Sequence, residues 1–287
     1  MSAVTSLIPA QSAPIIGIRD SGVGGLTVAR RVRQALPNAT LLYFADTAHV
    51  PYGDRPPHEV RHFALSISQF LIDQGAQIIV FACNTSSAYA LDQARHRFNN
   101  PIVGMIEPGA RAAVAASSGG TIGVLATQAT VDSQVYTRSL ARLKPGTPCL
   151  EIGCPEFVPL VESEQTHSQA AYRASQHYLQ PLLEAKADTI ILGCTHYPLL
   201  LPLLREVAPH VCFVDPAEAV AAEVGALVDQ LNPLACPKAA AAPDALRDII
   251  YVSGPRDGVQ HWSQKLFQEL APQRSLEMRS GPVFDVS

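Results

Sequence analysis

The chain has 287 residues, of which 47% are hydrophobic and 16% charged, and its formal net charge is −4. This composition is typical of a globular protein with a sizeable core, and the length suits two modest domains or one large one. The chain has no run of basic residues, so nothing points to nucleic acid as the main partner. Its longest apolar runs are far shorter than the ~20 residues of a membrane span.

The amino terminus and the cysteine content indicate the cellular compartment in which the protein is expected. Residues 1–13 are small and uncharged and lack the positive start of a secretory signal, so we predict a flexible tail there. Without such a signal the expected compartment is the reducing cytoplasm, where cysteines stay free thiols. The chain has no Cys-x-x-Cys pair, so no metal site is predicted. The six cysteines are Cys83, Cys149, Cys154, Cys194, Cys212 and Cys236.

In chain order, the first third alternates strands and helices, with a glycine-rich turn at residues 21–25. A dinucleotide-binding fingerprint would need a third glycine where Thr27 stands, and the Gly-Lys-Ser/Thr ending of a phosphate-binding loop is absent. The turn is therefore either a tight strand-to-helix connection or a place where backbone N–H groups hold a carboxylate. The predicted elements are strands 14–20, 40–45, 78–82 and 101–105, and helices 26–36, 57–74 and one ending near residue 98.

The pattern then restarts, and its alternation predicts an α/β fold with parallel sheets and right-handed crossovers. Spacing alone leaves open whether the last elements extend a second sheet or return to the first. The expected strands are 121–126, 148–152, 190–193, 211–214 and 248–253. The expected helices are 131–143, 169–185, 198–207, 216–231 and 259–270, with a proline-broken segment at 154–162 and a Pro/Ala-rich connector at 232–243.

Two cysteines occupy matched positions. Residues 78–82 precede Cys83 and residues 190–193 precede Cys194, so each cysteine follows an apolar run. Such a run predicts a strand buried on both faces, and ligands of open parallel sheets bind where the strands end. We therefore expect the two halves of the chain to bring these thiols to opposite sides of one substrate.

Two facing thiols suit proton transfer at a carbon atom. A free cysteine has a pKa of about 8.5, so a few per cent is thiolate near neutrality, and neighbouring groups raise that fraction. If a thiolate takes a proton while the facing thiol gives one, the configuration of the carbon is inverted without a cofactor. The candidate helpers are Asp20 and Ser21, Asn84 and Thr85 after the first thiol, and Thr195 and His196 after the second.

A purely structural role competes with each of these interpretations. A single buried cysteine is most often an inert small hydrophobe, and the four cysteines without the matched setting are assigned that role. Glu162 either caps a helix or hydrogen-bonds near the second thiol, and Tyr136 is expected in the core. The histidines expected at the surface are His49, His58, His62 and His96.

Six motifs, in order and at matching spacing, resemble those of the glutamate racemase family over roughly residues 15–255. One such motif alone is weak, whereas six in order are highly specific. The first three are Asp20-Ser21-Gly22-Val23-Gly24-Gly25-Leu26-Thr27, Asp46-Thr47 with Pro51-Tyr52-Gly53, and Ala82-Cys83-Asn84-Thr85. The others are Ile106-Glu107-Pro108, Val158-Pro159-Leu160-Val161-Glu162 and Gly193-Cys194-Thr195-His196-Tyr197-Pro198.

The resemblance implies cofactor-independent interconversion of L- and D-glutamate, which supplies D-glutamate for peptidoglycan. It implies that Cys83 deprotonates the D-enantiomer and Cys194 the L-enantiomer, with Asp20, His196 and Glu162 as further catalytic residues. It also implies a homodimer. The implied substrate-binding residues are Asp20, Ser21, Pro51, Tyr52, Gly53, Asn84, Thr85, Thr195 and His196.

The resemblance also implies the domain plan. Two similar doubly wound α/β domains are expected, with the active site at their interface. The chain after the second cysteine unit is expected to return to the first domain. Residues 14–107 and 215–287 then form one domain, and residues 108–214 form the other.

One position departs from the resemblance, and two other functions compete with it. Arg19 stands where the family usually has an aromatic or aliphatic residue. Because a buried unpaired charge is costly, we expect this side chain to point away from the site or to pair with an acidic neighbour. A racemase of the same superfamily, acting on aspartate, would share both cysteines, although the motif forms favour the glutamate enzymes. A thiol-based binding or redox protein would depend on a single cysteine.

Overall fold

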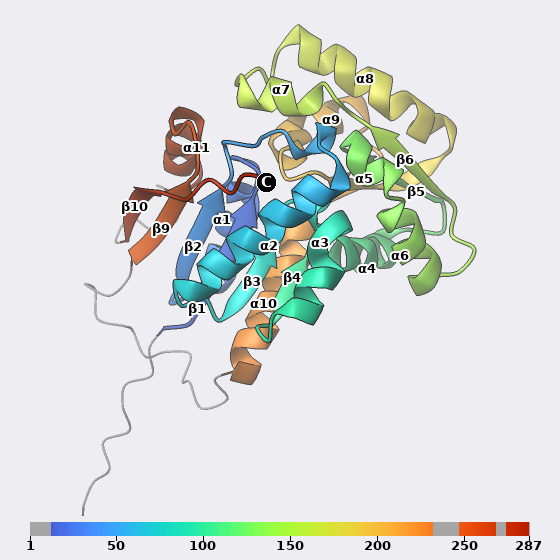
Figure 1. Ribbon diagram of the computed structural model, residues 1–287. Coiled ribbons are helices and arrows are strands. Elements are labelled where there is room, and N and C mark those ends of the chain that lie inside the picture. Colours follow the sequence, from blue (N-terminus) through green and yellow to red (C-terminus); the bar gives the residue numbers. More distant parts are fainter. Residues whose placement is uncertain (1–12, 232–246, 268–273, 287) are drawn as a thin grey trace, which may run out of the picture.

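The chain forms two parallel sheets with helices on both faces of each. The computed structural model describes residues 13–231, 247–267 and 274–286 (Figure 1). Within them, a six-stranded sheet has the order β10-β9-β2-β1-β3-β4 and a four-stranded sheet the order β6-β5-β7-β8. Every pairing in both sheets is parallel, so the predicted α/β class is confirmed.

The larger sheet comes from both ends of the described chain. Its strands are β1 (Ile15–Asp20), β2 (Thr40–Ala45), β3 (Ile78–Phe81), β4 (Ile102–Gly104), β9 (Arg247–Val252) and β10 (Ser275–Ser280). Helices α1 (Leu26–Ala35), α10 (Pro216–Leu231) and α11 (Asp257–Phe267) pack on one face, and α2 (Pro57–Asp73) and α3 (Asn84–Arg97) on the other. The short helix η1 spans Tyr52–Asp54.

The smaller sheet lies between two further helical layers. Its strands are β5 (Thr121–Ala126), β6 (Cys149–Gly153), β7 (Ala187–Gly193) and β8 (Cys212–Val214). Helices α4 (Ile106–Ala116) and α6 (Val135–Leu143) cover one face, and α7 (Phe157–Glu162), α8 (Gln169–Glu184) and α9 (Leu201–Val207) the other. The remaining helices are α5 (Gln128–Asp132) and η2 (Tyr197–Leu200).

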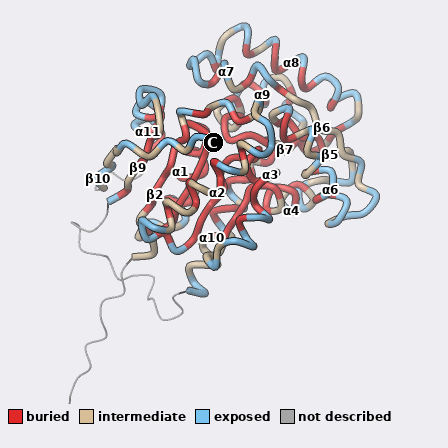
Figure 2. Tube along the Cα trace, in the orientation of Figure 1, coloured by how far each residue is buried: buried red, intermediate tan, exposed pale blue. Residues whose placement is uncertain are grey.

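The buried core holds in place the strand ends at which the candidate site residues lie. Strands β1 and β3 are buried along nearly their whole length, as expected for central strands covered on both faces. Figure 2 shows this burial running from the larger sheet into the smaller one. One cluster of buried apolar side chains includes Ile18, Val80, Leu125 and Leu192 and therefore joins both sheets.

Several local expectations differ from the structure, and helix α4 was not among the expected helices. The helix expected at 131–143 is two helices, α5 and α6, because Gln134 takes a left-handed φ of 51° between them. The proline-broken segment ends in helix α7, and strand β10 was not expected because it lacks a continuous apolar run.

The topology bears on the domain plan. Strand β8 belongs to the smaller sheet, while β9 and β10, which come later in the chain, belong to the larger one. The exact limits of the two domains stay predictions. The predicted connector at 232–243, Cys236, the end of the helix expected at 259–270 and nearly all of the predicted tail lie outside the described residues. No helix in the described ranges is both long enough and apolar enough to span a bilayer.

Candidate active site

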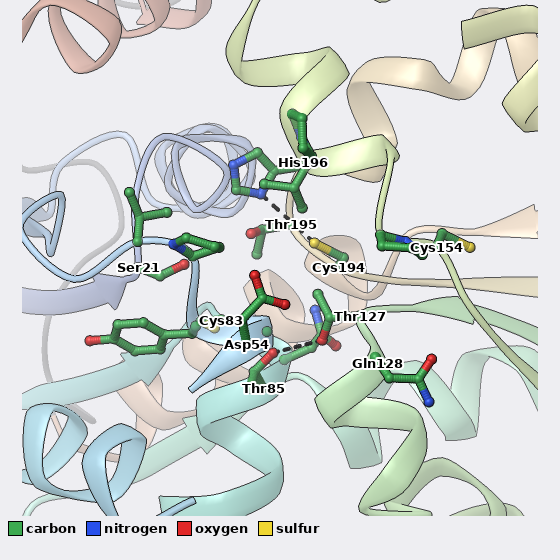
Figure 3. A pocket seen from close by; sticks show the side chains of 18 of the residues that line it. Ser21, Asp54, Cys83, Thr85, Thr127, Gln128, Cys154, Cys194, Thr195 and His196 are labelled. Atoms are coloured by element: carbon green, nitrogen blue, oxygen red, sulfur yellow. Dashed lines mark hydrogen bonds between the residues drawn. The ribbon is translucent and has the colours of Figure 1, made fainter. Parts of the chain in front are cut away.

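The two matched cysteines lie at the carboxyl ends of strands in different sheets. Cys83 follows β3 and is the N-cap residue of α3, and Cys194 follows β7. Both line one cavity of about 240 Å³ whose wall is built from both halves of the chain (Figure 3). This volume suits a ligand smaller than a drug-sized molecule.

Most of the predicted site residues share this cavity, and Asp20 is the exception. Their catalytic and binding roles stay predictions. The residues that line the wall as expected are Ser21, Pro51, Tyr52, Gly53, Cys83, Asn84, Thr85, Glu162, Cys194, Thr195 and His196.

His196 connects the second thiol to a carboxylate. Its Nδ1 faces Cys194 Sγ at 3.8 Å, and its Nε2 lies 2.8 Å from Glu162 Oε1. Burial lowers the pKa of His196, but its hydrogen bonds with Cys194 and Glu162 outweigh burial and raise that pKa well above the ordinary value. The imidazole beside the second thiol is therefore readily charged.

Asp20 lies behind the cavity wall, at the end of β1. It is fully buried, and its carboxylate accepts hydrogen bonds from Gly22 N at 3.0 Å and from Thr195 Oγ1 at 3.3 Å. Burial raises the pKa of Asp20, while the charge of His196 and the backbone N–H groups of Gly22 and Gly25 partly offset that effect. A raised pKa favours the protonated form of this carboxyl group compared with an exposed one.

The glycine-rich turn packs against the loop that carries Cys194. A Cβ atom on Gly24 would overlap Thr195 Oγ1 and His196 Nδ1. Thr27 Oγ1 donates to the Thr195 carbonyl at 3.2 Å. This close approach between the two halves accounts for glycine at position 24.

The first thiol sits at the start of a helix whose first residues reach toward the smaller sheet. Asn84 Oδ1 accepts a hydrogen bond from Tyr136 OH at 2.7 Å, and Thr85 Oγ1 lies 2.9 Å from Thr127 Oγ1. Tyr136 is fully buried, as expected, and its hydroxyl also orients Asn84. Burial raises the pKa of the Cys83 thiol and Asp20 adds to that effect, whereas the nearby Arg19 guanidinium opposes it.

Sequence reasoning missed part of the wall. Thr127 and Gln128 follow β5 directly, and β5 pairs with β7, so the strand-end rule applied to the cysteines would have found them. Asp54 also lines the cavity (Figure 3). The other unpredicted lining residues are Val50, Cys154, Pro155, Val158, Pro159 and Gly193.

The loop after β2 contains a buried polar cluster. Tyr52 OH donates to Asp46 Oδ2 at 2.5 Å, and Ser253 Oγ donates to Asp46 Oδ1 at 2.7 Å. His49 Nδ1 lies 2.9 Å from Asp46 Oδ1, and the His49 ring stacks on Phe63 with centroids 3.9 Å apart. The expectation that His49 is a surface residue is therefore wrong, because the loop folds onto α2 and buries the ring.

Arg19 lacks the acidic partner that was one of the two expectations made for it. Its side chain is fully buried, and among the described residues its only hydrogen bond is from Nη2 to Tyr52 OH at 3.3 Å. The guanidinium lies over the rings of Tyr52 and Phe81, at 5.5 and 5.2 Å from their centroids. It forms no salt bridge within the described part of the chain, so the expected pairing with an acidic neighbour is not found there. Arg19 itself does not line the cavity and reaches its wall only through Tyr52.

The other described cysteines lack the setting of the matched pair. Cys154 lines the cavity, but its sulfur points away from Cys194 in Figure 3, and burial raises the pKa of this thiol well above its ordinary value. Burial raises the pKa of Cys149 to about 11, and Cys212 is exposed. Within residues 13–231, 247–267 and 274–286, no group of three or more His, Cys, Asp or Glu side chains is arranged to hold a metal ion.

Comparisons with known proteins agree with one another. A profile of the family described as Asp/Glu/Hydantoin racemase matches residues 26–224. The chain is 44% identical over 215 residues to a glutamate racemase of Exiguobacterium sibiricum, covering 75% of this chain and 79% of the relative. It is 49% identical over 205 residues to one of Desulforudis audaxviator, covering 71% and 75%.

Solved structures show the same relationship. Glutamate racemase isoform RacE1 from Bacillus anthracis superposes with a TM-score of 0.85 at 31% identity, covering 95% of this chain and all of the other. The glutamate racemase of Francisella tularensis, solved in complex with D-glutamate, superposes with a TM-score of 0.83 at 26% identity, covering 95% of this chain and 98% of the other.

Proposed function

Because this chain belongs to the glutamate racemase family and is an isomerase of that family, we propose that it interconverts L- and D-glutamate by a two-thiol mechanism. The observation that carries this proposal is the shared cavity: Cys83 and Cys194 reach it from the ends of strands in two different sheets. No cofactor is needed in this proposal, since one thiolate and one thiol suffice to move the α-proton.

The proposed reaction balances in two proton transfers. The thiolate of one cysteine removes the proton from the α-carbon and becomes a thiol, which leaves an enolate-like carbanion. The other cysteine then protonates the opposite face of that carbon and becomes a thiolate. By analogy with the family, Cys83 acts on the D-enantiomer and Cys194 on the L-enantiomer, and reversal exchanges the two roles.

The surrounding groups are proposed to tune and orient this chemistry. His196, held by Glu162 and facing Cys194, supplies positive charge near the second thiol. Asp20 shares a proton near Cys83. Polar groups of the wall bind the amino and carboxylate groups of the substrate and stabilise the charge that develops on it. The wall residues proposed for binding, beside His196, are Ser21, Pro51, Tyr52, Gly53, Asn84, Thr85 and Thr195. Asp20, which lies behind the wall, is proposed with them by analogy with the family.

The biological setting is proposed on the family resemblance. The product D-glutamate supplies peptidoglycan synthesis, the enzyme works in the cytoplasm, and two copies form a homodimer. The Escherichia coli relative, at 28% identity, was solved with L-glutamate and the activator UDP-MurNAc-ala.

One assay tests the reaction directly. The purified protein, without added cofactor, is incubated with L-glutamate in heavy water, and optical rotation and α-deuteration are followed together. Loss of rotation with deuterium at the α-carbon is the expected result. If glutamate is inert and aspartate reacts, the chain is an aspartate racemase. If both are inert, the two-thiol proposal fails.

A further inference from the structure

Arg19 holds a positive charge in an apolar layer beside the candidate active site. The side chain is fully buried, and its Nε and Nη1 have no hydrogen-bond partner within the described residues. Its contacts are the hydroxyl and ring of Tyr52 and the ring of Phe81. Such a cation is strongly unfavourable unless nearby anionic or aromatic groups offset the loss of water.

The strand register places Arg19 close to the first thiol. Arg19 on β1 pairs with Phe81 on β3. Cys83 comes two residues after Phe81 and belongs to the same buried cluster on the α2/α3 face. Two residues of strand advance the chain by roughly 7 Å, so Cys83 lies about one pleat repeat beyond the residue opposite Arg19.

We propose that Arg19 is a positioning residue for Cys83: its buried positive charge favours the thiolate form of that side chain, and its bond to Tyr52 holds the neighbouring wall of the cavity. This inference rests on the proposed function, because it assigns a purpose to the thiolate of Cys83. The titratable and charged groups around Cys83 and Arg19 are Asp20, Tyr43, Asp46, Tyr52 and Cys194.

Two influences disfavour the thiolate form of Cys83, and the positive charge of Arg19 opposes them. Burial raises the pKa of the Cys83 thiol, and Asp20 raises it further. Arg19 lowers the pKa of Cys83, and it also lowers those of Asp20 and Tyr52 against the larger effect of burial. Removing the guanidinium would leave Cys83 facing only groups that disfavour its thiolate, apart from backbone N–H donation at Ser86.

The test measures the ionisation of Cys83 without relying on turnover. In the full-length Cys194→Ala protein, which removes coupling to the second thiol, the rate of Cys83 alkylation by iodoacetamide is followed against pH by peptide mass spectrometry. Arg19→Met removes the charge at similar length, and Arg19→Lys retains it. Arg33→Met is the matched control, because Arg33 is also buried but pairs with Asp248, which Arg274 still contacts in that variant.

We expect Arg19→Met to raise the pH midpoint of Cys83 alkylation by about one unit, and Arg19→Lys and Arg33→Met to leave it nearly unchanged. An unchanged midpoint in Arg19→Met overturns the inference, as does an equal shift in Arg19→Lys, because the charge would then not be the cause. If Arg19→Met does not fold, Arg19→Leu is tested in its place against the same criterion.

Measurements of racemase activity distinguish a failure of this inference from a failure of the proposed function. With Cys194 intact, Arg19→Met should lose roughly tenfold in kcat/KM at pH 7 and recover at higher pH, as the acid limb of its profile shifts by about one unit. A wild-type chain that does not racemise glutamate defeats the proposed function even if the alkylation midpoint moves. A chain that racemises glutamate while the midpoint stays fixed defeats only the role of Arg19.

Discussion

Nε2 of His196 lies 2.8 Å from Oε1 of Glu162, and this contact ties the loop after β7 to helix α7. The His196 side chain is 2% exposed and that of Glu162 32%. With one ring nitrogen held by Glu162, the other faces Cys194. The pair therefore orients the imidazole and favours its charged form next to the second thiol.

Replacing Glu162 by Gln should destabilise the protein more at low pH than at high pH. The raised pKa of His196 means that its charge stabilises the fold fully below the ordinary value of about 6.5, and that this stabilisation is lost as pH rises through the raised value. We expect Glu162→Gln to lower the free energy of unfolding by about 1–2 kcal/mol at pH 6 and by less at pH 9. Urea unfolding at both pH values measures the difference.

Glu164→Gln is the control for this experiment. Glu164 lies 3.2 Å from His261, but both side chains are about half exposed. Such surface pairs contribute little, so the control should behave like the wild type at both pH values. An equal loss in Glu162→Gln at pH 6 and pH 9 would show that the charge of His196 does not depend on Glu162.

Either matched cysteine should be indispensable for racemisation. Cys83→Ala and Cys194→Ala are each expected to lose at least the ~10²–10⁴-fold that one acid–base group contributes. Cys212→Ala is the control because this cysteine is exposed and outside the cavity wall. Near-normal turnover in either of the first two variants would defeat the two-thiol mechanism.

Asp20→Asn should lower the activity of the protein without lowering its stability. The pKa of buried Asp20 is raised, so the native state loses stability as pH rises from the ordinary value of about 3.9 through the raised one. The neutral amide cannot carry a buried charge at any pH, and it can still accept from Gly22 N and donate to Thr195 Oγ1. We expect a midpoint of thermal unfolding at or above the wild-type value, with turnover reduced roughly 100-fold.

The opposite result would identify Asp20 as a structural residue. A drop of several degrees in the unfolding midpoint at pH 7, measured by circular dichroism, would mean that the ionised carboxylate stabilises the fold. Repeating the scan at pH 4 checks the sign, because the advantage of Asn should shrink there.

Gly24→Ala adds only one methyl group but should displace the loop that carries Cys194. Its Cβ would overlap Thr195 Oγ1 and His196 Nδ1, so both side chains must move. We expect turnover to fall at least tenfold, since small displacements of catalytic groups are costly. Gly225→Ala is the control: it has open space in helix α10 and should gain up to about 1 kcal/mol in stability. Steady-state kinetics and urea unfolding of both variants measure these effects.

Much of the fold could be predicted because its central strands have a strong local signature. Strands β1, β3, β5 and β7 are apolar runs bounded by turns, and burial on both faces produces that pattern. The edge strand β10 carries no such signature, since only its pairing with β9 defines it. The break at Gln134 was missed for a related reason: a left-handed residue other than glycine has no reliable sequence marker.

The sequence by itself determined the α/β class and the two matched thiols, because apolar runs and the residues that follow them are local features of the chain. Only the tertiary structure decided which side chains meet. His196 contacts Glu162, which is 34 positions away in the sequence, and Arg19 donates a hydrogen bond to Tyr52, which is 33 positions away. The burial of His49 likewise depends on packing against Phe63. Such contacts arise when distant segments pack together, and no local periodicity specifies the partner.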